Sequence, residues 1–241
     1  METRNQVVEA GASETMGGAR HRRSRPQPAP SASCGDTAVV LQSVCQLYLR
    51  GKVADVTYAT GAFWRKAKRQ FTLLRSDLSS GVDLRRLPYA AASLDGLICD
   101  PPFFRHSLTA YLHAPQMERS YGLSTAPKSH SGILELYFGA GKEALRVLRH
   151  GGYLVLKCQD EVAGGRQRFT HIELLLLIEK LGFRAVDLFV LVQKRVLPIS
   201  RGNQQRFARK NHSYILVFRK PRRVRAESRV GAEISRFFDS A

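Results

Sequence analysis

The alternation of β-type runs with helical segments between residues 37 and 220 limits the fold more than any other feature of this sequence. Apolar residues with helical spacing predict helices at residues 37–49, 131–148 and 170–181. Short β-type runs predict strands at residues 53–57, 71–74, 94–99, 153–156, 185–192 and 213–218. Strands that alternate with helices predict an α/β fold with a doubly wound, Rossmann-like sheet. Because the last two runs have no helix between them, we expect a C-terminal antiparallel strand pair.

Glycines mark the expected C-terminal ends of two of these helices. The long helix at residues 131–148 is expected to stop at Gly151 and Gly152, and the helix at residues 170–181 at Gly182.

Basic tails flank the predicted domain. Residues 1–36 combine Gly, Ala, Ser and Pro with a basic cluster, which is typical of a disordered tail that is solvated or that grips nucleic acid. Residues 221–241 form a second basic tail, whose last residues could dock as a short helix. The expected organisation is therefore a disordered basic tail at 1–36, one domain at 37–220 and a basic C-terminal tail at 221–241.

The charge of the chain indicates its class of partner. Lysine and arginine number 38 against 20 aspartate and glutamate residues, which gives a formal net charge of +18. Such an excess favours a polyanion, with nucleic acid ahead of an anionic membrane surface. The longest apolar runs, such as residues 174–178, are far shorter than the roughly 20 residues of a membrane span. We therefore expect a nucleic-acid partner and no membrane segment.

The cysteines are too scattered for a metal or disulfide framework. They stand at Cys34, Cys45, Cys99 and Cys158, with no C-x-x-C pair. A zinc ribbon is not expected, and a reducing compartment fits this usage best. The N-terminus also lacks the apolar segment of a secretory signal, so a cytoplasmic location is expected.

Acidic residues and a glycine follow the first two strands of the predicted sheet. The segment from Asp55 through Thr57 to Gly61 includes the end of the first strand and the loop after it, where glycine lets the backbone approach a ligand closely. Asp77 follows the second strand, where a carboxylate can accept both hydroxyls of a ribose. A further short strand is expected just before Asp83. Each acidic residue could instead cap a helix or pair with an arginine.

A rigid acceptor loop follows the strand at residues 94–99. It consists of Asp100, Pro101, Pro102 and Phe103. Two prolines fix φ and remove two backbone donors, so this loop offers acceptors only. Such a site suits a group with hydrogens to donate, such as an aromatic amine, and Phe103 offers a flat face on which a base could stack. The alternative is a structural turn that ends the strand.

Together, the Asp-x-Thr-x-x-x-Gly loop and Asp-Pro-Pro-Phe after a hydrophobic strand resemble the S-adenosylmethionine-dependent amino-methyltransferases that act on DNA or RNA. The resemblance covers residues 49–220 and implies that residues 37–220 are a methyltransferase domain. It implies that the loop containing Asp55, Thr57 and Gly61 holds the methionine part of the cofactor. It also implies that Asp77 holds the ribose and that Asp83 and Leu84 flank the adenine.

The same resemblance assigns the chemistry to the Asp-Pro-Pro-Phe loop. It implies that Asp100 and the Pro101 carbonyl bind the target amine, while Pro102 stiffens the loop and Phe103 stacks on a flipped base. In this family an aspartate before Pro-Pro goes with adenine N6 and a serine with cytosine N4. The expected reaction is therefore methylation of adenine N6 in DNA, without a metal. An RNA base methyltransferase is the alternative within the same chemistry.

Other residues depart from the family pattern or have simpler interpretations. Family loops usually read Phe-x-Gly-x-Gly, whereas Thr57 and Ala59 occupy the first two of those positions here. A catalytically impaired nucleic-acid-binding homologue is therefore the alternative from another class. The histidines after the acceptor loop, His106, His113 and His130, are interpreted as solvated loop residues. Lys157 at a strand end could line the site, but it is interpreted as a lysine that extends to solvent. Phosphate contacts are expected from residues 195–210 and the tails.

Overall fold

The described part of the computed structural model comprises residues 28–35, 37–64, 67, 69–101, 127–194 and 204–222. The strands are β1 (Ala32–Cys34), β2 (Lys52–Asp55), β3 (Thr72–Arg75), β4 (Leu94–Cys99), β5 (Leu148–Cys158), β6 (Glu161–Ala163), β7 (Arg166–Arg168), β8 (Arg184–Val192) and β9 (His212–Arg219). The α-helices described are α1 (Thr37–Tyr48), α4 (His130–Val147) and α5 (Thr170–Lys180). Two 3-10 helices are η1 (Ala62–Trp64) and η2 (Leu78–Ser80).

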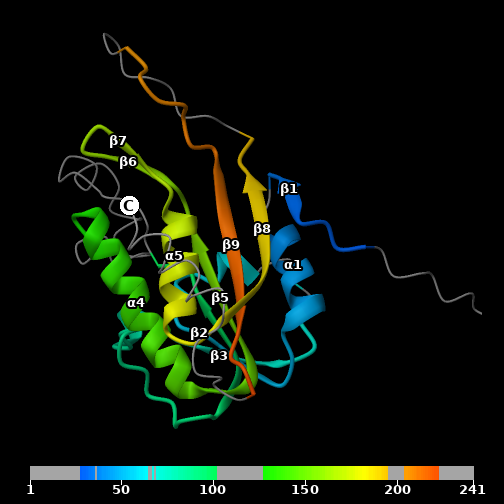
Figure 1. The fold of residues 1–241 in the computed structure, drawn as a ribbon. Helices are drawn as coiled ribbons and strands as arrows, with labels where there is room; N and C mark the ends of the chain where they lie inside the picture. Colours follow the sequence, from blue (N-terminus) through cyan, green and yellow to red (C-terminus); the bar gives the residue numbers. More distant parts are fainter. Residues whose placement is uncertain are drawn as a thin grey trace, which may run out of the picture.

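A mixed seven-stranded sheet forms the centre of the molecule, in the order β1-β8-β9-β5-β4-β2-β3 (Figure 1). Strands β3, β2, β4 and β5 are parallel to one another. Strand β9 runs antiparallel to both β5 and β8. The predicted α/β class, with a doubly wound sheet and a C-terminal antiparallel pair, is confirmed.

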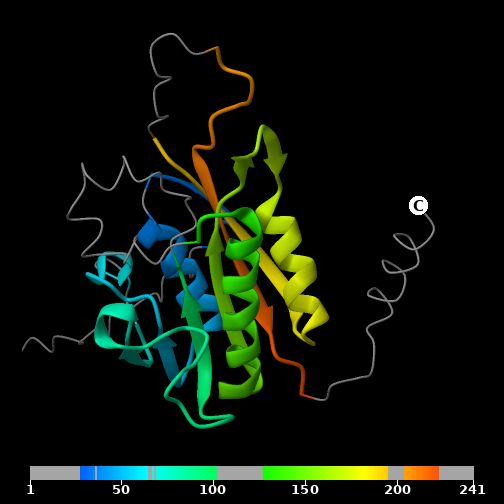
Figure 2. The ribbon, with the colours of Figure 1, turned by 90° about the vertical axis from the view of Figure 1, so that its left-hand side faces the viewer.

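Helices cover both faces of the sheet. Helices α4 and α5 lie on one face, and α1 lies on the other (Figures 1 and 2). Successive strand residues point to opposite faces, so Leu154 and Leu156 join the core under α4 and α5 while Val155 joins the core under α1. Burial of each such side chain contributes about 1.5–3 kcal/mol to folding. Both layers are therefore held by apolar packing against one continuous sheet.

The long helix ends within one residue of its predicted end, but its glycines do not form that end. Strand β5 begins at Leu148, whose backbone is already extended, at φ −74° and ψ 141°. Gly151 and Gly152 therefore lie inside β5 and do not end the helix. The Gly151 amide donates to the Lys220 carbonyl, and a Cβ on Gly152 would lie 3.1 Å from the Asp95 carbonyl oxygen. These glycines serve close strand contacts, which sequence spacing does not reveal.

Part of the predicted N-terminal tail belongs to the sheet. Residues Ala32–Cys34 form the edge strand β1, which pairs with β8 in parallel from Ala32–Val190 to Cys34–Val192. The prediction of disorder as far as residue 36 is wrong for this segment, because a tertiary partner supplies its hydrogen bonds. The remainder of the tail up to residue 27, and the C-terminal tail from residue 223, lie outside the described residues.

The short strand expected before Asp83 is also absent from the described residues. The chain forms η2 there instead, and Asp83 makes only an isolated bridge with Arg86. The Asp77 side chain and the left-handed Gly81 bracket this helical turn and favour it over a strand.

No helix in the described ranges is long and apolar enough to cross a membrane. All four cysteines are free thiols. Within the same ranges, no group of three His, Cys, Asp or Glu side chains is arranged to hold a metal ion.

Candidate active site

The predicted site residues gather at the carboxyl edge of the parallel strands. Asp55 is the last residue of β2, Asp77 follows β3 and Asp100 follows β4. Strand register aligns Asp55 with Ile98 of β4, and Cys99 of β4 with Leu156 of β5. Because parallel strands end at the same edge, three segments that are distant in sequence meet there.

Asp55 is the buried centre of this edge, with 1% of its surface exposed. Its Oδ1 accepts hydrogen bonds from the Thr57 backbone amide (2.9 Å) and from Thr57 Oγ1 (3.1 Å). Its Oδ2 accepts a 2.6 Å bond from the indole Nε1 of Trp64. Burial raises the pKa of Asp55 to about 6, and the nearby Asp100 charge adds to this rise, against the opposing effect of these donors.

Asp100 is held from two sides. Its backbone amide donates a 2.7 Å hydrogen bond to Thr57 Oγ1, which links the loop after β2 to the loop after β4. Its Oδ2 accepts a 2.7 Å charge-assisted bond from Lys157 Nζ on β5. Both side chains are mostly buried, with 15% of Lys157 and 21% of Asp100 exposed. The carboxylate is therefore fixed in direction as well as in position.

The position of Lys157 corrects the interpretation that the sequence favoured for it. It is not a lysine that extends to solvent, because its ammonium group pairs with Asp100 and lies 5.8 Å from the centre of the Phe63 ring. The signal that could have revealed this is strand register. Cys99 aligns with Leu156 across the β4–β5 pair, so the next residues of the two strands, Asp100 and Lys157, emerge side by side.

The loop between Asp55 and Gly61 is held to both neighbouring strands. The Val56 amide donates to the Ile98 carbonyl, and the Tyr58 amide donates to the Ser76 carbonyl. Ala59 has a left-handed φ of 46°, a conformation that favours glycine. Ala59 thus adopts a conformation that favours glycine, the residue that the family pattern has at this position.

Gly61 has a local packing role. Its φ is 69°, and a Cβ at this position would lie 2.6 Å from the Tyr58 hydroxyl. The space beside Gly61 is therefore occupied by the Tyr58 side chain, over whose ring the Arg75 guanidinium lies at 5.4 Å.

Asp77 caps η2 through one carboxylate oxygen, while its other oxygen accepts no hydrogen bond from the described residues. Its Oδ1 accepts bonds from the Ser80 amide (3.0 Å) and Ser79 Oγ (2.5 Å), and these cap η2. Within the described part of the chain, neither of these bonds uses Oδ2. An acceptor oxygen at the end of the strand beside β2 is the chemistry that a ribose diol requires.

Asp83 and Leu84 are held by contacts of their own. Asp83 forms a two-pronged ion pair with Arg85, at 3.0 Å to Nε and 2.6 Å to Nη2. Hydrogen bonds from Arg85 lower the pKa of Asp83. Leu84 is buried in the apolar core under α4 and α5. The predicted adenine contact of these two residues stays a prediction.

Only part of the acceptor loop is described. Asp100 and the buried Pro101 are within the described residues, whereas Pro102 and Phe103 lie outside them. The roles predicted for those two residues therefore stay predictions.

The residues present fit S-adenosylmethionine by the chemistry of their donor set. Asp55 ends β2 and Asp77 follows the adjacent strand β3, and Ala59 in the loop after β2 has a left-handed φ. Asp77 Oδ2 offers an acceptor for ribose, and the loop after β2 lies beside the Asp100 acceptors. The cofactor that the resemblance implies is thus compatible with these side chains.

Comparison with known families decides the membership of the chain. The family model for N6 and N4 methyltransferases, described as DNA methylase, matches residues 94–236, which is more than half of the chain. The chain belongs to the DNA methylase family. This membership confirms the predicted family. Among curated proteins, none matches the chain.

Solved structures with a similar arrangement include several methyltransferases. One is a Thermus thermophilus protein assigned as a DNA modification methylase, which is 22% identical to this chain. The match covers 64% of this chain and 58% of the Thermus protein, with a TM-score of 0.39. The structure of the same protein in complex with S-adenosyl-L-methionine is also 22% identical. The match covers 64% of this chain and 57% of that chain, with a TM-score of 0.38. A Bacillus halodurans protein assigned as a methyltransferase is 12% identical. That match covers 77% of this chain and 99% of the Bacillus protein, with a TM-score of 0.46. The chain spans less than two thirds of the length of the Thermus protein.

The raised pKa of Asp55 predicts a characteristic pH dependence of stability. The Asp55 carboxyl binds its proton more tightly in the folded protein, where its pKa is about 6, than in the unfolded chain, where the ordinary value of 3.8 applies. The stabilising contribution is therefore complete below the ordinary pKa and is lost as the pH rises through about 6. We expect the difference in unfolding free energy between wild type and Asp55→Asn to fall by about 2–3 kcal/mol between pH 4 and pH 7.

Urea denaturation at a series of pH values measures this difference directly. Asp95→Asn, which removes a carboxylate at the opposite end of β4, is the matched control. If the unfolding free energies of wild type and Asp55→Asn changed in parallel with pH, the raised pKa of Asp55 would be contradicted.

Proposed function

We propose that this protein transfers a methyl group from S-adenosylmethionine to an exocyclic base amine in DNA, with adenine N6 as the target. The observation that carries the proposal is the position of Asp100. Its backbone is bound to Thr57 and its carboxylate to Lys157, at the edge where the loop after β2 also ends. Membership of the DNA methylase family supports DNA as the substrate polymer.

The proposed cofactor site lies at the ends of β2 and β3. When bound, S-adenosylmethionine supplies a methyl group that its sulfonium sulfur activates. Asp77 holds the ribose hydroxyls through Oδ2, while the loop that contains Asp55, Thr57 and Gly61 holds the methionine part. Asp83 and Leu84 flank the adenine in this proposal. The capping bonds on Oδ1 of Asp77 support the assignment because they orient its second oxygen.

Asp100 and Pro101 supply the acceptors for the target amine. Lys157 uses Asp100 Oδ2, whereas Oδ1 accepts no hydrogen bond from the described residues. Oδ1 and the Pro101 carbonyl each accept one amine hydrogen, which draws the nitrogen lone pair out of conjugation with the ring. The same acceptors stabilise the positive charge that develops on nitrogen. This arrangement aligns the amine for attack without a metal.

The choice of adenine rests on the residue that precedes the two prolines. It is Asp100, and in the resembling enzymes aspartate at this position goes with adenine N6. In the proposal, Pro102 keeps the loop rigid and Phe103 stacks on the base, where the larger purine gains more from stacking than a pyrimidine does.

The first test concerns the cofactor. Asp77→Asn keeps one side-chain oxygen that can accept the hydrogen bonds from Ser79 Oγ and the Ser80 amide. It replaces the second carboxylate oxygen, the proposed ribose acceptor, with an NH₂ group. We expect the affinity for S-adenosylmethionine to fall at least about tenfold, since hydrogen bonds to a charged group contribute about 1.5–3 kcal/mol. Isothermal titration calorimetry measures the affinity, and Ser79→Ala is the control for a changed cap. Equal affinity in Asp77→Asn and wild type would remove Asp77 from the site.

The second test concerns the chemistry. Asp100→Ala is expected to retain cofactor binding while methyl transfer to DNA falls at least about 100-fold, as on loss of one preorganised hydrogen-bonding group. Asp95→Ala removes the same charge at the other end of β4 and is the matched control. Transfer of labelled methyl groups measures both rates. If Asp100→Ala turned over like wild type, the acceptor loop would be only a structural turn.

A further inference from the structure

Two projections extend from the same edge of the sheet as the candidate active site. One is the β6–β7 hairpin after β5, and the other is the described segment 204–210 before β9 (Figures 1 and 2). The Gln159 side chain joins their bases, because its Nε2 donates to the carbonyls of His212 (2.8 Å) and Lys210 (3.3 Å). The stacked rings of His171 and Tyr214, 4.0 Å apart, add a second connection. The two projections therefore form one rim.

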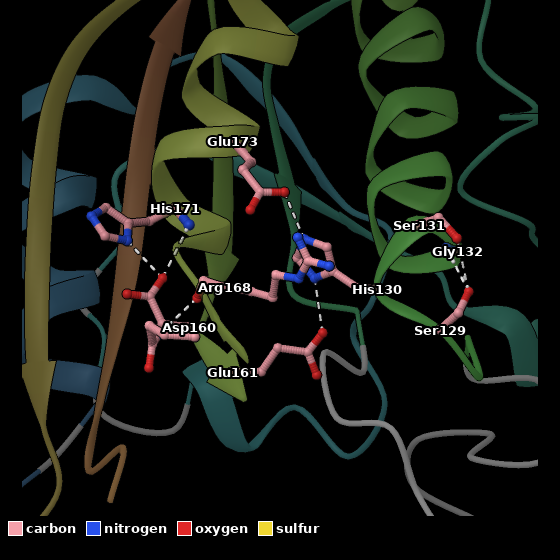
Figure 3. Close-up of polar contacts among 10 residues, drawn as sticks. Ser129, His130, Ser131, Gly132, Asp160, Glu161, Arg168, His171 and Glu173 are labelled. Atoms are coloured by element: carbon pink, nitrogen blue, oxygen red, sulfur yellow. Dashed lines mark hydrogen bonds and ion pairs between the residues drawn. The ribbon is translucent and has the colours of Figure 1, made fainter. Parts of the chain in front are cut away.

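The acidic residues of this rim are turned inwards. In residues 159–171 and 204–214 the acidic residues are Asp160 and Glu161. Asp160 is 5% exposed and accepts a 2.7 Å bond from His171 Nδ1. Glu161 lies 2.8 Å from His130 Nδ1, and the other ring nitrogen of His130 lies 2.6 Å from Glu173 (Figure 3). These contacts also correct the interpretation of His130 as a solvated loop residue.

Three arginines of the rim are exposed to solvent. Arg166 is exposed directly after the Gly164–Gly165 turn, and both glycines have positive φ, as a tight hairpin requires. Arg206 and Arg209 are exposed on the second projection. With the carboxylates folded away and these cations on the surface, the rim presents positive charge.

Two exposed phenylalanines lie among these cations. Phe169, which follows β7, is 52% exposed, and Phe207, between Arg206 and Arg209, is 37% exposed. Both are unusual because most large apolar side chains of the described chain are buried. Exposed apolar rings and exposed cations on one rim match the two components of a nucleic-acid strand, its bases and its phosphate backbone.

We propose that this rim, defined by Arg166, Phe169, Arg206, Phe207 and Arg209, is the surface that binds duplex DNA beside the active site. The arginines contact phosphates, and the phenylalanines pack against bases that are unstacked when the target is extruded. This inference rests on the proposed function for the identity of the polymer. It adds the hairpin and the aromatic residues to the contacts expected from basic sequence alone.

The salt dependence of binding tests the arginines. In the Arg166→Ala/Arg206→Ala double variant, we expect weaker binding of duplex DNA and a log–log salt slope that is shallower by about 0.9 for each arginine. Arg184→Ala/Lys180→Ala removes two exposed positive charges near the opposite edge of the sheet and should leave the slope unchanged. Fluorescence anisotropy of a labelled duplex measures both. Equal slopes in wild type and the rim variant, or equal changes in both variants, would overturn the proposal.

The phenylalanines need a separate readout. Phe169→Ala should weaken DNA binding at least about fivefold with an unchanged salt slope, because stacking releases no counterions. Leu47→Ala, which trims an exposed apolar residue of α1, is the control. An unchanged affinity in Phe169→Ala would remove the stacking role. Binding of RNA but not of duplex DNA by wild type would overturn DNA as the occupant.

The outcomes also separate this proposal from the proposed function. A protein that binds DNA through the rim but transfers no methyl group contradicts the function alone. A protein that methylates DNA while the rim variants bind it like wild type contradicts the rim alone.

Discussion

The hydrogen bond from the Asp100 amide to the Thr57 hydroxyl joins two parts of the chain that are 43 residues apart, and the candidate site is built around it. The same hydroxyl donates to Asp55, so one side chain connects the buried end of β2 to the acceptor loop after β4. Parallel pairing of these strands brings the groups within reach. Thr57 stands where the loops of the resembling enzymes have phenylalanine. It therefore supplies a polar connection between the proposed cofactor site and the proposed site for the target amine.

The electrostatics of the edge follow from this arrangement. Asp55 and Asp100 carry like charges near each other, and one of them is almost completely buried, which raises its pKa. Lys157 places a positive charge on the more exposed member of the pair. The buried carboxylate thus remains a structural acceptor for Trp64 and Thr57, while the carboxylate next to the lysine keeps an oxygen for the proposed substrate.

Much of this fold is readable from the sequence, and the exceptions have physical causes. The strand at Leu94–Cys99 and the final strand pair were predictable because β-branched and apolar runs mark buried strands. Strand β1 was not, since its hydrogen bonds depend on β8, far away in sequence. The end of α4 was predicted to within one residue, but Gly151 and Gly152 do not cause it, because they lie inside β5 and serve strand contacts. In the site, Asp55, Thr57 and Asp100 were predictable from strand ends, whereas the role of Lys157 depends on register between β4 and β5.

The most direct test of the account is the identity of the methylated nucleoside. Duplex DNA and RNA of the same sequence are incubated with the protein and methyl-labelled S-adenosylmethionine, digested to nucleosides and analysed by mass spectrometry. The account predicts N6-methyladenine in the DNA sample. N4-methylcytosine alone, or a methylated ribonucleoside alone, would contradict the assigned target. The absence of methyl transfer by protein that binds the cofactor would contradict the proposed activity itself.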